Sequence, residues 1–85
     1  MKLASGNVQI KGQRLSAFIQ AKTKKRMVEM LNEHTEGYFS MNHFRNYWYD
    51  SGNSTMHEMA GDQEGLWVAP DKYSQWKYNT YKKIA

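Results

Sequence analysis

The sequence predicts an α+β fold, a small single domain over residues 1–85 in which an N-terminal β-hairpin and two helices lie on a small antiparallel sheet. Three observations lead to this fold class. A length of 85 residues suits one hydrophobic core and not two. Apolar and polar residues alternate in the first quarter of the chain, as they do in strands. Two later segments carry the capping and spacing signals of helices.

The predicted hairpin turns at Gly12. Val8 and Ile10 alternate with polar residues before this glycine, and the alternation resumes from Leu15 to Ala21 after it. Because glycine adopts turn conformations without steric cost, it favours a reversal of the chain here. We expect the second strand to end just after this alternation, near residue 22.

The first helix is predicted over residues 24–34, with Thr23 as its N-cap. One long helix over residues 14–34 is the alternative. At about 100° per residue, however, Leu15 and Leu31 would lie on nearly opposite sides of such a helix. A strand followed by a separate helix accounts for both apolar groups.

Residues 38–49 fit two structures. Phe44 and Trp48 are spaced as on one face of a helix capped by Ser40, but the alternation within the same segment also suits a strand. The sequence leaves this choice open. Farther along the chain, Thr55 begins a capping-box pattern that predicts a single helical turn.

The second main helix is predicted at the C-terminus, over residues 71–84. Pro70 suits the first position of a helix, and Trp76, Thr80 and Ile84 recur on one side of it. We therefore expect an amphipathic helix whose apolar side packs on the sheet.

Aromatic rings and methionines are expected to form much of the core, because aliphatic residues are few. The chain has three Phe, three Trp, six Tyr and six Met. The tryptophans are all predicted to lie in the core: Trp48, Trp67 and Trp76. The better candidates for the surface are four tyrosines: Tyr47, Tyr49, Tyr78 and Tyr81.

Charge is distributed along the chain in blocks. Residues 1–28 contain seven Lys or Arg and no acid, residues 29–71 contain eight acids and one Arg, and residues 72–85 add four lysines. Such blocks have two interpretations. The basic ends either pair with the acidic middle, inside one chain or across a homodimer, or they converge into one patch that attracts a polyanion.

The basic run over residues 22–26 is the strongest local signal for nucleic-acid binding. Its four positive charges can neutralise several phosphates, although phosphate contacts do not distinguish one sequence from another. Aromatic rings beside basic groups stack unpaired bases, which favours single-stranded RNA. The predicted RNA-binding residues are Lys22, Lys24, Lys25, Arg26, Arg14, Arg45, Tyr47, Tyr49, Lys77, Lys82 and Lys83.

Nothing in the sequence predicts catalysis, a metal or a cofactor. There is no cysteine, and therefore no disulfide and no thiolate ligand. The histidines His34, His43 and His57 lack the spacing of a metal site, and no phosphate-binding loop or nucleophile motif occurs. No signal peptide or membrane span is evident, so we expect a non-enzymatic cytoplasmic protein.

In size, absence of cysteine, richness in aromatic residues and methionine, and blocks of charge, the chain resembles early proteins of tailed bacteriophages. Among these it is similar to the ToxIN inhibitory factors of T4-like phages, and the similarity extends over the whole chain. The resemblance implies a counter-defence inhibitor that binds RNA and a ToxN-like endoribonuclease toxin in the bacterial cytoplasm. It assigns no site residue.

The predicted function is therefore a small RNA-binding inhibitor or adaptor. A protein-only inhibitor of a host enzyme is one alternative, since the acidic middle or the aromatic surface would then cover the enzyme. A DNA-binding regulator is another, with residues 24–34 as the recognition helix, although no helix-turn-helix pattern precedes them.

Overall fold

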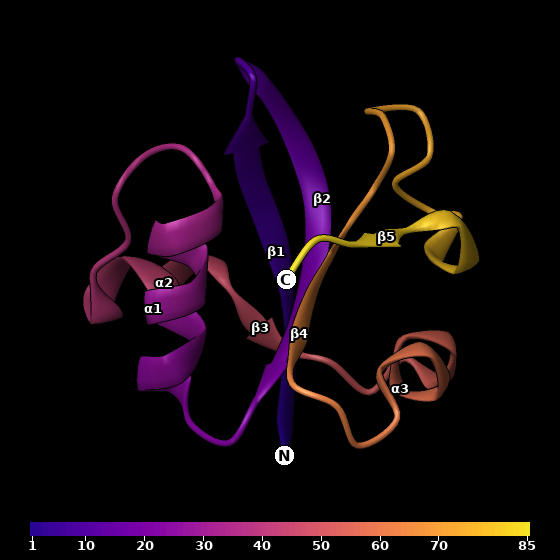
Figure 1. The fold of residues 1–85 in the computed structure, drawn as a ribbon, viewed down its shortest axis with the longest axis horizontal. Coiled ribbons are helices and arrows are strands. Elements are labelled where there is room, and N and C mark those ends of the chain that lie inside the picture. Colours follow the sequence, from indigo (N-terminus) through magenta and orange to yellow (C-terminus); the bar gives the residue numbers. More distant parts are fainter.

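A five-stranded antiparallel sheet forms the centre of the molecule, in the strand order β3-β1-β2-β4-β5. A computed structural model describes residues 1–85, with the elements β1 (Lys2–Ile10), β2 (Gln13–Ala21), α1 (Lys24–His34), α2 (Met41–Tyr47), β3 (Tyr49–Asp50), α3 (Ser54–Ala60), β4 (Gly65–Val68), the 3-10 helix η1 (Tyr78–Thr80) and β5 (Lys82–Lys83). Helices α1 and α2 lie against the first face of the sheet, and α3 lies with the C-terminal segment on the second face (Figure 1). The predicted α+β class is confirmed.

The N-terminal hairpin is confirmed as well. Strands β1 and β2 pair over all nine residues of each. Their two-residue turn consists of Lys11 and Gly12, with φ angles of 51° and 76°, and turns of this kind match the natural twist of the strands. The carboxylate of Glu36 accepts hydrogen bonds from both turn N–H groups, so a loop distant in sequence fixes the tip of the hairpin.

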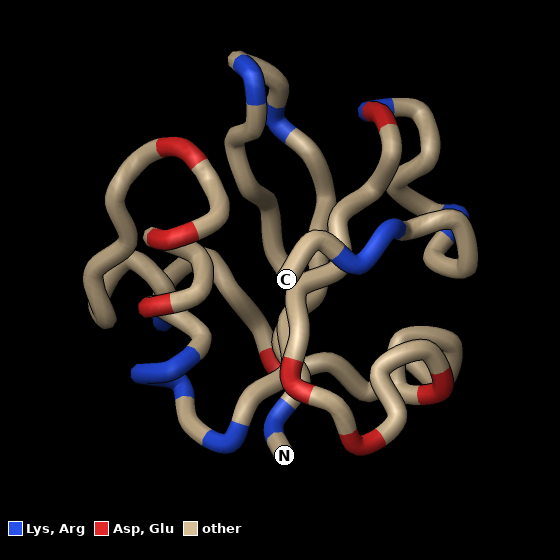
Figure 2. Tube along the Cα trace, viewed as in Figure 1, with Lys and Arg blue, Asp and Glu red and all other residues tan.

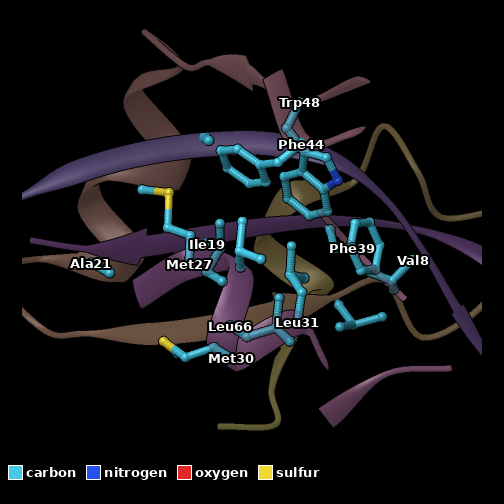
Figure 3. Close-up of a cluster of buried hydrophobic side chains, with 14 of the residues drawn as sticks. Val8, Ile19, Ala21, Met27, Met30, Leu31, Phe39, Phe44, Trp48 and Leu66 are labelled. Carbon is cyan, nitrogen blue, oxygen red and sulfur yellow. The ribbon is translucent and has the colours of Figure 1, made fainter. Parts of the chain in front are cut away.

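Helix α1 has the predicted bounds and the predicted cap. The hydroxyl of Thr23 accepts a hydrogen bond from the backbone N–H of Arg26 at 3.1 Å. The buried side of the helix, which includes Met27 and Leu31, packs on the first face against strand residues such as Ile19 (Figure 3). The separate strand and helix are therefore the correct alternative to one long helix.

The segment that the sequence left open is a helix followed by a short strand. Helix α2 begins after Ser40, whose hydroxyl accepts a hydrogen bond from the N–H of His43 at 3.1 Å. The rings of Phe44 and Trp48 stack with centroids 5.6 Å apart, and both are buried in the first-face core (Figure 3). One helical turn brings the two rings into contact, whereas a strand would place them on one face but about 13 Å apart, too far to stack.

A helix also forms where the capping-box pattern predicted a single helical turn, but it begins earlier than expected. The N-cap of α3 is Asn53, whose side chain accepts from the N–H of Met56 at 3.0 Å, and Thr55 lies inside the helix. Asn is at least as good an N-cap as Thr, and this start places Met56 and Ala60 against the second face. None of the helices has both the length and the hydropathy that crossing a membrane requires.

The prediction of a C-terminal helix over residues 71–84 is wrong. This segment forms turns, η1 and β5, and β5 pairs with Trp67 and Val68 of β4. Two further hydrogen bonds join Leu66 of β4 to the chain end, at 2.8 Å from Ile84 and 3.3 Å to Ala85. Strand β4 would otherwise present a row of unpaired backbone groups, and satisfying them outweighs the local helical pattern.

Two aromatic residues of this segment exchange their predicted places. Trp76, predicted in the core, is exposed, and Tyr81, predicted at the surface, is buried. Tyr81 stacks on Phe18 with centroids 5.5 Å apart, and Phe18 stacks on Trp67 at 5.1 Å. The pairing of β5 with β4 sets which ring reaches the second-face core.

Candidate nucleic-acid interface

The second face of the sheet is covered only along part of its length. Near the start of β1 it carries apolar residues such as Leu3 and Phe18, which α3 and the C-terminal segment bury. Side chains alternate between the two faces of a strand. Towards the hairpin turn, the side chains that fall on the second face are polar. Gln9 lies opposite Arg14, and Asn7 lies opposite Ser16. We call these last four residues the open sheet face.

Three cavities surround the open sheet face. The large cavity, of about 570 Å³, lies between Asn7, Gln9 and Arg14 and the segment from Glu36 to Tyr49. The tryptophan cavity, of about 260 Å³, lies between Tyr49 and Trp76. The hairpin-tip cavity, of about 350 Å³, lies between the β1–β2 turn and residues 71–73. The cavities adjoin one another, since Asn7, Tyr47 and Tyr49 line the first two and Arg14 lines the large and hairpin-tip cavities.

Every aromatic side chain with more than half of its surface exposed lines one of these cavities. They are Tyr38 at 81%, Tyr47 at 61%, Tyr49 at 66%, Tyr73 at 79% and Trp76 at 76%. Exposed hydrophobic side chains that gather in one region of a surface mark sites of interaction. Their position around one polar face indicates a single binding surface.

The segments that carry these rings are fixed by buried side chains and hydrogen bonds. Trp48 is buried in the first-face core, and its neighbours on either side, Tyr47 and Tyr49, remain exposed. Tyr38 belongs to the loop between α1 and α2, where the side-chain amide of Asn32 bonds both backbone groups of Phe39, at 2.6 and 2.9 Å. The loop is therefore fixed beside the hairpin that Glu36 also holds.

A buried tyrosine anchors the opposite wall of the surface. The hydroxyl of Tyr81 donates to the carbonyl of Gln75 at 2.7 Å, which holds the turn that carries Trp76. Burial raises the pKa of Tyr81, and a hydrogen bond with Ser16 of the open sheet face partly opposes this rise. The exposed Trp76 is thus carried by a segment that is tied to the core.

The polar side chains of this surface differ in whether they have partners. Asn7, Gln9 and Arg14 form no side-chain hydrogen bond and no ion pair within the chain, although they line the large cavity. The two carboxylates of the surface are both engaged: Glu36 bonds the hairpin turn, and Asp71 accepts from the N–H of Tyr73 at 2.9 Å. The groups left free for a ligand therefore include two amides and a guanidinium, and in the hairpin-tip cavity the ammonium of Lys72, which forms no ion pair and lies 5.3 Å from the centroid of the Tyr73 ring.

The predicted basic run lies elsewhere and is partly neutralised. Arg26 contacts three carboxylates, with nitrogen to oxygen distances of 3.2 Å to Glu64, 3.6 Å to Glu29 and 3.9 Å to Glu33. The hydrogen bond that Arg26 donates to the carboxylate of Glu64 raises the pKa of Arg26. For this residue the basic end pairs with the acidic middle inside one chain, as the first interpretation of the charge blocks supposed.

The other lysines of the run differ from one another. Lys24 lies 3.9 Å from the carboxylate of Asp50 in β3. Lys22 and Lys25 are exposed and form no ion pair. The run therefore offers fewer free positive charges than its sequence indicates.

The two basic ends do not converge. The run at the start of α1 and the basic C-terminal segment lie on different sides of the sheet, and the hairpin carries basic residues both at its tip and, at Lys2, at the opposite end (Figure 2). Lys83 donates to the side chain of Gln63 at 3.1 Å and lies over the ring of Trp67 at 5.6 Å. Lys77, Lys82 and Arg45 are exposed and form no ion pair, and none of them lines a cavity.

Of the residues predicted from sequence, the structure brings together Arg14, Tyr47 and Tyr49. Sequence reasoning missed Asn7, Gln9, Tyr38, Tyr73 and Trp76. For Gln9 a signal existed, because it is a polar member of the alternation that predicted the hairpin. No sequence signal located the last three rings.

Metal binding finds no support in the geometry, since no group of three or more His, Asp or Glu side chains is placed to hold an ion. His43 instead packs its ring between Phe39 and Tyr47, with centroids 5.1 and 4.8 Å away. The chain was also compared with models of protein families, with curated proteins and with solved structures, and none of them matches it.

Proposed function

We propose that the protein is a non-enzymatic binder of single-stranded RNA and that the RNA lies across the open sheet face and its three cavities. One observation carries the proposal. All five exposed aromatic side chains line these cavities, beside amide and guanidinium groups that have no partner in the chain.

The chemistry of such a surface favours unpaired bases. A base that stacks on an aromatic side chain gains about 1–3 kcal/mol, and only a single strand exposes its bases in this way. A duplex offers mainly phosphates, and the free positive charge of the surface is modest. Free amides also provide partners for the 2′-hydroxyl group, by which proteins distinguish RNA from DNA.

Fluorescence anisotropy with a labelled ten-nucleotide single-stranded RNA tests this proposal. Tyr47→Ala and Tyr49→Ala should each weaken binding by about 5- to 150-fold, which corresponds to one lost stack. The matched controls are Tyr47→Phe and Tyr49→Phe, which keep the ring and should bind within about threefold of the wild type. Wild-type affinity in the alanine variants, or better competition by duplex DNA of equal length, would overturn the proposal.

On the resemblance to the phage inhibitory factors, we further propose that the RNA-bound protein blocks a ToxN-like endoribonuclease in the bacterial cytoplasm. Inhibition should then be lost after RNase treatment of the protein and in the Tyr47→Ala, Tyr49→Ala double variant. A protein-only inhibitor would keep its activity in both cases. Inhibition assays with the purified toxin separate these outcomes.

A further inference from the structure

Arg14 occupies the junction of two cavities. It lines both the large cavity and the hairpin-tip cavity, is exposed, and has no hydrogen-bond or ion-pair partner. Its place is well defined, because it lies in β2 opposite Gln9 and two residues after a turn that Glu36 holds. Because this guanidinium has no partner in the chain, it is available to bind a ligand group and does not stabilise the fold.

In the hairpin-tip cavity Lys72 offsets Asp71, so a phosphate contact by Arg14 there is the competitor that the experiment must separate. The charges of the large cavity argue against a phosphate. Glu36 lines it with Arg14 and no Lys or second Arg does, so a phosphate beside the guanidinium would approach a carboxylate, and like charges at short range are unfavourable. A neutral group with hydrogen-bond acceptors meets no such repulsion.

We infer that Arg14 binds the O6 and N7 atoms of an unpaired guanine, so that the RNA of this surface is one with an accessible guanosine. The inference rests on the proposed function, since it assumes that RNA binds here. The guanidinium carries only donors in a rigid fork, and guanine presents two adjacent acceptors on this edge. Adenine presents one acceptor and one donor there, and the donor would face the donors of Arg14.

The surroundings of Arg14 suit the rest of the base. Tyr38 and Tyr49 line the large cavity with exposed rings, on which a purine can stack, and its volume of about 570 Å³ lies within the range of small-ligand sites. The amide of Gln9 lies on the neighbouring strand and can bond the base or its ribose. Cytosine also has two adjacent acceptors, but its single ring gains less from stacking, so it is the competitor that the experiment must include.

The test uses ten-nucleotide RNAs in fluorescence anisotropy. One RNA contains only uridine. Each of the others is the same oligouridine with a single central guanosine, adenosine, cytidine, inosine or 7-deazaguanosine. The wild type should bind the guanosine RNA about tenfold more tightly than the all-uridine RNA, as one bidentate contact implies. Inosine keeps O6 and N7 and should retain this preference, whereas 7-deazaguanosine lacks N7 and should lose most of it.

Two variants assign the preference to a residue. Arg14→Lys keeps the charge but loses the fork, so the ratio of its affinities for the guanosine and all-uridine RNAs should fall from about tenfold to near one. Arg45→Lys is the matched control, because Arg45 is also exposed and unpaired but lines no cavity, and it should keep the preference.

Four results would overturn the inference while leaving RNA binding in place. They are equal binding of all RNAs, a preference for cytidine, a preference that survives 7-deazaguanosine but not inosine, and an Arg14→Lys variant that weakens all RNAs alike. The third would place recognition on the Watson–Crick edge, and the fourth would make Arg14 a phosphate contact. If none of these RNAs binds, and an RNA of mixed sequence does not bind either, the proposed function itself is contradicted.

Discussion

The indole ring of Trp48 lies directly on the backbone of Gly6, so that a Cβ atom on residue 6 would come within 2.6 Å of its Cε2 atom. This contact joins β1 to the end of α2, where Trp48 stands between the two tyrosines that separate the large cavity from the tryptophan cavity. Because only glycine lets the indole pack here, both the core and the binding surface depend on the absence of a side chain at Gly6.

Gly6→Ala should destabilise the protein by about 1–3 kcal/mol, because the buried, rigid indole cannot withdraw from the added methyl group. The displaced Trp48 should also shift Tyr47 and Tyr49, and RNA affinity should fall with stability. Thermal unfolding followed by circular dichroism measures the first effect. Gly52→Ala is the control, since a Cβ there meets nothing within 4 Å, and equal melting temperatures for the two variants would contradict the prediction.

Arg26→Ala should lower the melting temperature more than Lys25→Ala, although both remove one positive charge from the first turn of α1. Arg26 contacts Glu64, Glu29 and Glu33, whereas Lys25 forms no ion pair. The loss should be largest at low salt, because salt screens exposed charges. A double-mutant cycle with Glu64→Gln measures the coupling, and a coupling of zero would show that this pair does not contribute.

RNA binding should quench the fluorescence of Trp76 and leave that of the other tryptophans largely unchanged. Trp76 is exposed in the tryptophan cavity, while Trp48 and Trp67 are buried. A base that stacks on the indole quenches it, so titration with single-stranded RNA should reduce the emission of the wild type. Trp76→Phe should remove this signal, and an equal quench in that variant would place the RNA elsewhere.

Stability should fall at alkaline pH in a step that depends on Tyr81. Burial raises the folded-state pKa of Tyr81 above its ordinary value of 10.0, so the folded protein holds this proton more tightly than the unfolded chain. Its contribution is fully present below pH 10.0 and is lost as the pH rises through the folded-state pKa.

Tyr81→Phe tests this step. The variant should be less stable at neutral pH by about 0.5–1.5 kcal/mol, because the hydrogen bond to Gln75 is lost. Its melting temperature should fall less than that of the wild type above pH 10.0, since no phenol remains at this position to lose its proton. Parallel alkaline curves for the two proteins would contradict the prediction.

Local signals were sufficient for the first half of the fold. The alternation around Gly12 predicted the hairpin, and Thr23 predicted the start of α1, because a turn or a cap involves hydrogen bonds between residues close in sequence. The exposure of Tyr47 and Tyr49 was also predicted correctly.

Only the tertiary structure decided the C-terminal segment and the location of the binding surface. Residues 71–84 have a helical pattern, but the backbone groups of β4 required a neighbouring strand, and this pairing buried Tyr81 and exposed Trp76. Arg26 appeared free in the sequence, yet its main partner, Glu64, lies 38 residues away. By itself, then, the sequence determined the hairpin and α1, whose stabilising contacts are local. The structure decided which rings and charges stay free, because pairings between distant segments leave no local pattern.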